Sequence, residues 1–214
     1  MTNPLLEVRM ESLRESLEKL AAAVDDNLRS VLLKLTCDKA VSAGAPFVSV
    51  DELARTVRER CLLLLAREHP MAGDLKFAMA ALRVGHDYER VNELAQALIR
   101  RIEKLTGTPV QDLMQDMTGV MADILKLHEI VRRTWLRDRG HFTSEEIKPQ
   151  VAAHSSVVGS QISVIQNKIM EAIARGGNNA EIFVEVVLAC RHLKRIATTL
   201  ESIPDELNAF DKAA

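Results

Sequence analysis

Apolar residues recur along the first part of the chain at alternating steps of three and four positions. An α-helix has 3.6 residues per turn, so this spacing gathers the apolar side chains on one stripe, whereas a strand would need strict alternation. The stripe consists of Leu6, Met10, Leu13, Leu17, Leu20, Val24, Leu28, Val31 and Leu35. The pattern predicts one long helix from about Leu6 to Leu35.

The segment that follows breaks this period and predicts the start of a second helix. Residues 42–47 contain Gly44 and Pro46, and both residue types interrupt helices. Ser49 and Glu52 then have the spacing of a capping box. The second helix is expected from about residue 50 to Glu68, with Pro70 closing it.

A third helix is predicted from the stripe that runs from Val84 to Leu105, and it should stop at Gly107. Thr108 and Gln111 have the spacing of a capping box for a fourth helix, and Pro109 suits its first turn. The fourth stripe covers residues 113–135. This helix should end near Gly140.

Two more helices complete the pattern. Thr143 and Glu146 repeat the capping-box spacing, and the fifth stripe covers residues 147–169. The sixth stripe covers residues 182–203, with Pro204 marking a frayed or kinked end. His154 lies on the fifth stripe, where a hydrogen-bonded core histidine is the expected role.

The order of the helices repeats, which indicates an internal duplication. Sliding residues 73–95 onto 178–200 places Arg90 on Arg195 and Val91 on Ile196. Short connections between long helices favour antiparallel neighbours. The predicted fold is all-α, with six long helices in two tandem antiparallel three-helix bundles, residues 1–106 and 107–214.

Composition supports a helical protein and excludes several classes. The chain is 47% hydrophobic but only 3% aromatic, which favours helices over strands. Its net charge of -2 argues against a nucleic-acid binder. Three scattered cysteines, Cys37, Cys61 and Cys190, match no disulfide or zinc spacing, so buried free thiols are expected.

The chain also shows no sign of a targeting segment or of catalysis. No basic start precedes a long apolar run, and the longest run of leucines, Leu62 to Leu65, is too short to cross a bilayer. We therefore expect a cytoplasmic protein. A Gly-rich phosphate loop and the HExxH and CxxC motifs are missing from the sequence, so we do not expect an enzyme.

The third predicted helix carries a charged strip beside its apolar stripe. His86, Glu89, Glu93 and Gln96 follow one another at steps of three, four and three, so the two carboxylates can point the same way. Carboxylates are hard ligands that suit hard cations or iron, and an imidazole adds a borderline ligand. A solvated face is the alternative, and it is common on helices with this spacing.

Two strings in this region resemble the signature of the PhoU family: residues 67–76, Arg-Glu-His-Pro-Met-Ala-Gly-Asp-Leu-Lys, and residues 87–95, Asp-Tyr-Glu-Arg-Val-Asn-Glu-Leu-Ala. The family has a basic-x-x-Pro…Asp-Leu-Arg segment and then Asp-Leu-Glu-Arg-Ile-Gly-Asp-x-Ala. The resemblance implies a multinuclear iron or zinc cluster. Its elements carry onto this chain as Asp87, Glu89, Arg90 and Glu93. Together with His86 from the charged strip, the three carboxylates are the predicted metal ligands.

The second copy of the signature departs from the family pattern. Residues 191–199 keep both arginines, Arg191 and Arg195, but Lys194 stands where the family has glutamate and Thr198 where it has aspartate. A lysine ammonium repels a cation. Iron or zinc is therefore expected at the first repeat only.

The resemblance implies a regulator that restrains phosphate uptake by the Pst transporter and the signalling of its associated histidine kinase. Contact with the transporter ATPase subunit and the kinase would carry this function, and the protein would be peripheral to the membrane through these partners and homodimeric. The expected partner-binding residues are Arg90, Arg195, Arg132 and Arg133. The last two belong, with His128, to a basic end of the fourth helix that is predicted to be solvated.

Two alternatives remain open at the sequence level. The first is a metal-binding helical bundle of the ferritin-like kind, which pairs Glu with Glu-x-x-His on facing helices. This chain has no Glu-x-x-His. The second is a divergent PhoU-domain scaffold that has lost its metal and regulates another transporter.

Overall fold

A computed structural model describes residues 4–36, 49–68, 70, 72–136, 144–175 and 179–208. Within these ranges the chain forms helices and no strand, as predicted. The helices are α1 (Pro4–Thr36), α2 (Val50–Glu68), α3 (Ala72–Leu105), α4 (Gln111–Leu136), α5 (Ser144–Ala174) and α6 (Ala180–Asn208). None of them is long and apolar enough to cross a membrane.

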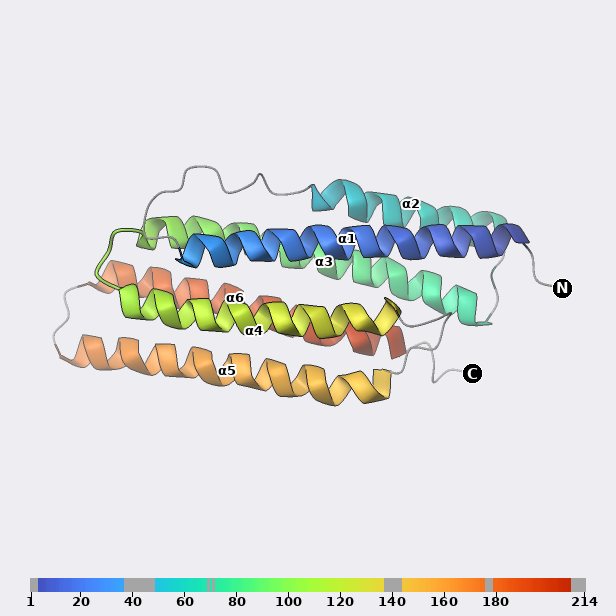
Figure 1. Cartoon of the computed structure of the whole chain (residues 1–214). Coiled ribbons are helices and arrows are strands. Elements are labelled where there is room, and N and C mark those ends of the chain that lie inside the picture. The colour runs from blue at the N-terminus through green and yellow to red at the C-terminus, as the bar shows by residue number, and fades with distance from the viewer. Residues whose placement is uncertain are drawn as a thin grey trace.

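The helices form two trios that lie side by side. In the first trio α1, α2 and α3 all pack against one another, and in the second α4, α5 and α6 do the same. Figure 1 shows the six helices along one common axis, with α1–α3 above and α4–α6 below. The trios meet through α1 on α4 and through α3 on α6, the most extensive helix pair. The domain boundary after residue 106 stays a prediction.

The predicted apolar stripes form the core. Leu13, Val91, Ile124, Ile165 and Ile196, one from each of five helices, are fully buried and belong to one continuous apolar cluster that also includes α2. Burial of this much apolar surface is the main favourable contribution to folding. Because the cluster is continuous, the two trios share one core.

The turn between α3 and α4 confirms one prediction and overturns another. Gly107 has a φ of 78°, a conformation that glycine adopts without strain, and it ends α3 as expected. Thr108 does not cap α4, because its Oγ1 donates to the carbonyl oxygen of Leu105 at 2.6 Å. At the start of α4, the backbone amide of Met114 instead donates a hydrogen bond to the carbonyl oxygen of Val110 at 3.0 Å. The last carbonyls of α3 lack helical partners, so they compete for the threonine hydroxyl.

The predicted ends of α2 are correct, because the helix runs from Val50 to Glu68. The predicted end of α6 at Pro204 is wrong. The last helix runs through Pro204 to Asn208. Ile203 and Pro204 are buried, and this packing offsets the backbone hydrogen bond that proline cannot make. The predicted cap at Thr143 and the predicted end of α4 near Gly140 lie outside the described residues.

Two of the cysteines are buried free thiols, as predicted. Cys61 in α2 and Cys190 in α6 are both inaccessible. Burial raises the pKa of each thiol to about 12, so neither side chain forms a reactive thiolate near neutral pH. Cys37 lies outside the described residues.

Candidate functional site

The segment of α3 that carries the signature divides into a buried side and an exposed side. Tyr88 and Val91 are fully buried in the core. His86, Arg90 and Glu93 are exposed. The apolar stripe therefore packs α3 against its neighbours. The charged residues of the same helix lie on its exposed side.

Glu89 is bound by an arginine of the same trio. Arg58 of α2 donates from Nη2 to both carboxylate oxygens of Glu89, at 2.9 and 3.0 Å. His86 Nδ1 lies 3.7 Å from Glu89 Oε2. The guanidinium supplies the positive charge that a metal would otherwise supply.

Asp87 faces a different neighbour. Each residue turns an α-helix by about 100°, so Asp87 and Glu89 point about 160° apart. Burial raises the pKa of Asp87 to about 6, and the nearby negative charge of Glu206 on α6 adds to this shift. Asp87 therefore belongs to the contact between α3 and α6.

The four predicted metal ligands do not converge. Glu89 is held by Arg58, Asp87 faces α6, and His86 and Glu93 are exposed. Throughout the described ranges, no group of three or more His, Cys, Asp or Glu side chains is placed to hold a metal ion. A multinuclear cluster needs several such ligands around one point. The residues present do not fit the iron or zinc cluster that the family signature implies.

The contact between α3 and α6 is tied by ion pairs at both ends. At one end Glu185 of α6 accepts from Arg101 Nη1 and Lys104 Nζ of α3, each at 2.8 Å. The hydrogen bonds from Lys104 and then from Arg101 make the largest contributions to a lowered pKa of Glu185. At the other end Arg83 of α3 pairs with Glu206 of α6. The antiparallel helices are thus fixed in register.

Between these two ties lies a cluster of positive charge. His192 of α6 is half-buried. Burial lowers the pKa of its imidazole, and the charges of four arginines lower it further: Arg101, Arg195, Arg191 and Arg100. Two of these arginines come from α3 and two from α6. Positive charges from both helices therefore act on this one imidazole.

The predicted partner-binding residues have different environments. Arg90 is exposed on α3, and Arg195 is half-buried on α6. Arg132 forms an ion pair with Glu18 of α1, so it ties the two trios together. Arg133 pairs with Glu129 one turn earlier in α4. Arg90 and Arg195 thus lie on the most extensive helix pair, and both α4 arginines have intramolecular partners.

A buried polar cluster joins α1, α3 and α4, and sequence analysis missed it. His128 Nδ1 of α4 lies 3.2 Å from Asp25 Oδ1 of α1. The ring of Tyr88 meets the His128 ring edge to face, with centroids 5.5 Å apart. The hydrogen bond from His128 lowers the pKa of Asp25 to about 2. Burial lowers the pKa of His128, which favours the neutral imidazole.

Two predictions about histidines are therefore wrong. His128 is fully buried instead of solvated, and His154 is only half-buried instead of a core residue. The sequence did contain an indication, because His128 lies four residues after Ile124 and three before Val131, on the apolar stripe of α4. A histidine at such a position is buried when the facing helix offers a polar partner.

A second buried pair lies beside this cluster. Asn27 Nδ2 of α1 donates to Asn92 Oδ1 of α3 at 2.8 Å, and both side chains are buried. In the family signature the positions of Tyr88 and Asn92 hold leucine and glycine. This chain therefore replaces two signature positions with polar side chains that point into the packed interior.

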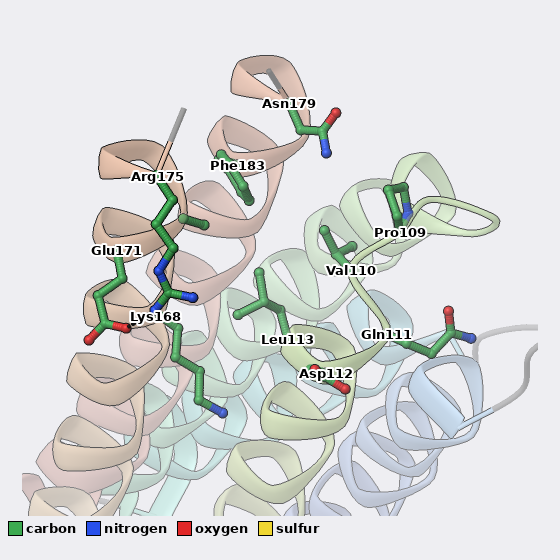
Figure 2. Close-up of a pocket in the computed structure, with 11 residues that line it drawn as sticks. Pro109, Val110, Gln111, Asp112, Leu113, Lys168, Glu171, Arg175, Asn179 and Phe183 are labelled. Carbon is green, nitrogen blue, oxygen red and sulfur yellow. Dashed lines mark hydrogen bonds and ion pairs between the residues drawn. The ribbon is translucent and has the colours of Figure 1, made fainter. Parts of the chain in front are cut away.

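A cavity of about 550 Å³ lies at one end of the second trio, where α4 begins, α5 ends and α6 begins (Figure 2). Val110, Leu113 and Phe183 supply apolar walls. The cations at its rim are already paired: Lys168 Nζ with Asp116 Oδ2 at 2.5 Å, and Arg175 with Glu171 at 2.9 Å. The cavity contains none of the signature residues.

The chain resembles known proteins in domain content, sequence and fold. Residues 10–102 match the model of the PhoU domain. The phosphate-specific transport system accessory protein PhoU homolog 1 of Thermotoga maritima is 18% identical over 199 residues, which cover 91% of this chain and 84% of that protein. Its Methanothermobacter thermautotrophicus counterpart is 31% identical over 80 residues, 34% of this chain and 36% of that protein.

A solved structure extends the likeness to nearly the whole chain. The crystal structure of PhoU from Pseudomonas aeruginosa superposes with a TM-score of 0.81, covering 97% of this chain and 99% of that one. The sequence identity is 16%, so this likeness establishes the fold. The second trio, which the domain model does not reach, therefore has the same architecture as in that structure.

Proposed function

Because this chain belongs to the PhoU family, with its PhoU domain at residues 10–102, we propose that it regulates phosphate uptake and phosphate-responsive signalling through direct contact with a transporter ATPase subunit and a sensor histidine kinase. The relatives that it resembles are named as accessory proteins of a phosphate-specific transport system. In this proposal the protein is a cytoplasmic homodimer that reaches the membrane through its partners.

The exposed charge on α3 and α6 is the observation that supports action by contact. The signature arginines Arg90 and Arg195 lie outside the apolar core, on adjacent helices whose register is fixed by ion pairs at both ends. A rigid pair of helices holds charged side chains at constant spacing, which favours selective recognition of a complementary surface. An arginine buried in the core could not contact a partner protein in this way.

Co-purification tests the proposal. The tagged protein should retain the ATPase subunit or the kinase from cells grown with ample phosphate, and deletion of the gene should alter phosphate-regulated expression. Arg90→Ala should weaken retention, whereas Arg55→Ala, at an exposed position of α2 outside the predicted partner-binding set, should not. Unaltered phosphate control in the deletion strain would remove the proposed function.

The homodimer is tested separately. Light scattering on the eluting peak of a size-exclusion column should give twice the chain mass of 23.8 kDa. A peak at the mass of a single chain over the working concentration range would contradict this part of the proposal and leave the regulatory role standing.

A further inference from the structure

One stretch of α6 carries a row of positive charge with no acidic residue. Residues 186–200 contain Arg191, His192, Lys194 and Arg195 and neither Asp nor Glu. Arg191 and Lys194 are exposed, and so is Arg100 on the facing side of α3. We call the set Arg100, Arg191, Lys194 and Arg195 the basic seam. The chain as a whole has a net charge of -2, so these basic residues are concentrated on one part of its surface.

The second repeat lacks the two signature carboxylates of the first, and one of them is replaced by a positive charge. With the shift of 105 residues that superposes Arg90 on Arg195, Glu89 corresponds to Lys194 and Glu93 corresponds to Thr198. In the first repeat the acidic position is neutralised inside the trio by Arg58. Among the described residues no carboxylate forms an ion pair with Arg191, Lys194 or Arg195. Within the described part of the chain, the second repeat thus presents positive charge that no ion pair neutralises.

The surroundings of the basic seam make an anionic partner favourable. The positive charges of Arg100, Arg101, Arg191 and Arg195 all lower the pKa of the half-buried His192, because they disfavour a charged imidazole. Glu185 neutralises Arg101 at one end of this region. The remaining like charges repel one another, and an approaching carboxylate would relieve that repulsion.

We propose that the basic seam is a docking surface for an acidic helix of a partner protein. Arg191 and Arg195 are four residues apart on α6, so they lie about 6 Å apart along its axis. Glutamates at four-residue spacing on a partner helix have the same repeat and can pair with both. Arg100, Arg191 and Lys194 are exposed, and no residue of the basic seam lines the cavity of Figure 2, which favours an extended partner over a small anion.

This inference rests on the proposed function in one respect, namely that the protein works by contacting partners. It adds the chemistry of the partner surface and the face of this chain that receives it. Arg195 is shared with the predicted partner-binding set, whereas Arg100, Arg191 and Lys194 are assigned here from the structure.

Peptide binding tests the docking surface. A fluorescein-labelled helical peptide with glutamates at four-residue spacing is titrated with the full chain, and fluorescence anisotropy gives Kd. The double variant Arg191→Glu, Lys194→Glu should bind at least about tenfold more weakly, and binding of the unaltered chain should weaken as salt is added. The same peptide with glutamine in place of glutamate should not bind.

A matched control distinguishes an effect of the basic seam from an effect of the net charge of the chain. Lys19→Glu with Arg55→Glu makes the same change of charge at exposed positions of α1 and α2, and it should bind the peptide within about twofold of the unaltered chain. Circular dichroism confirms that both variants remain folded. Equal weakening in the control, or unchanged binding in the double variant, would overturn the proposal. Tighter binding of inorganic polyphosphate or of a short DNA duplex than of the peptide would also overturn it.

The peptide-binding result can be interpreted independently of the test of the proposed function. Failure of the peptide to bind removes the acidic docking surface whatever the phosphate phenotype is. Unaltered phosphate control in the deletion strain removes the proposed regulatory role, and a positive peptide result would then describe a partner contact in some other process.

Discussion

At the scale of single residues, the feature that distinguishes this chain is the polar cluster buried where α1, α3 and α4 meet. Burying a polar group costs free energy unless it is hydrogen-bonded. Here Asp25 and His128 bond to each other, and Asn27 bonds to Asn92. Such pairs form in only one alignment of the helices, so they disfavour axial slippage of α1 relative to α3 and α4.

The asparagine pair gives the first prediction. Asn27→Ala leaves the buried Asn92 without its 2.8 Å donor, and the free energy of unfolding should fall by about 1 to 3 kcal/mol. The double variant Asn27→Ala, Asn92→Ala should cost less than the sum of the two single changes, because both members of the pair are removed. Urea denaturation followed by circular dichroism measures these values. Simple additivity would show that the pair is not coupled.

Asp87 gives a prediction about pH. Its pKa is raised to about 6 in the folded chain, from an ordinary value of 3.8, chiefly by burial. Well below pH 3.8 the carboxyl is protonated in both states and has no effect. As pH rises from about 4 to 6, the unfolded chain loses the proton first, so stability falls, and above about pH 6 the penalty is complete.

Asp87→Asn should therefore raise the free energy of unfolding by about 1 to 2 kcal/mol at about pH 7.5, after allowing for solvent screening, and by much less near pH 3.5. Thermal unfolding at the two pH values measures the difference. Glu93→Gln is the control, because this carboxylate on the same helix is exposed and its removal should leave the pH profile unchanged. A gain of equal size at both pH values would contradict the explanation.

At the scale of elements, the apolar stripes and one glycine determine where the helices lie and where α3 ends. Gly107 adopts a φ of 78°, and no heavy atom would crowd an added Cβ there. A substitution at this position therefore tests backbone strain alone. Thr108 then supplies its hydroxyl to the end of α3, so the two residues together complete the turn.

Gly107→Ala should lower the free energy of unfolding by about 1 kcal/mol, because an L-residue is strained at positive φ. The matched control is Gly119→Ala within α4, where an added Cβ also meets open space. That change should raise stability by about 0.5 to 1 kcal/mol, since alanine favours a helix over glycine. Denaturant midpoints of the two variants should therefore shift in opposite directions. Shifts in the same direction would refute this account of the turn.

At the scale of the whole molecule, the two trios are joined by apolar packing as well as by ion pairs. The buried residues form a single cluster that includes all six helices of the described chain. Exposed ion pairs contribute little to stability, so the shared core contributes more than the ion pairs to holding the two trios together. The pairs Arg132 with Glu18 and Arg83 with Glu206 chiefly set the alignment of the trios.

A shared core predicts cooperative unfolding. Differential scanning calorimetry should show one transition whose calorimetric enthalpy equals its van't Hoff enthalpy. The duplication would otherwise allow each trio to melt at its own temperature. Two resolved transitions would show that residues 1–106 and 107–214 are energetically separate domains.

The sequence by itself determined the helices, their apolar faces and the end of α3 at Gly107, because the 3.6-residue period and the backbone freedom of glycine act over a few neighbouring residues. It could not determine which polar residues beside the stripes are buried. His128 meets Asp25, 103 positions away in the chain, and Glu89 meets Arg58 from another helix. His154, on an equally apolar stripe, remains half-buried. The partner of each polar side chain depends on which helix faces which, and it is set only when the helices pack, because burial and pairing are fixed by contacts between distant segments.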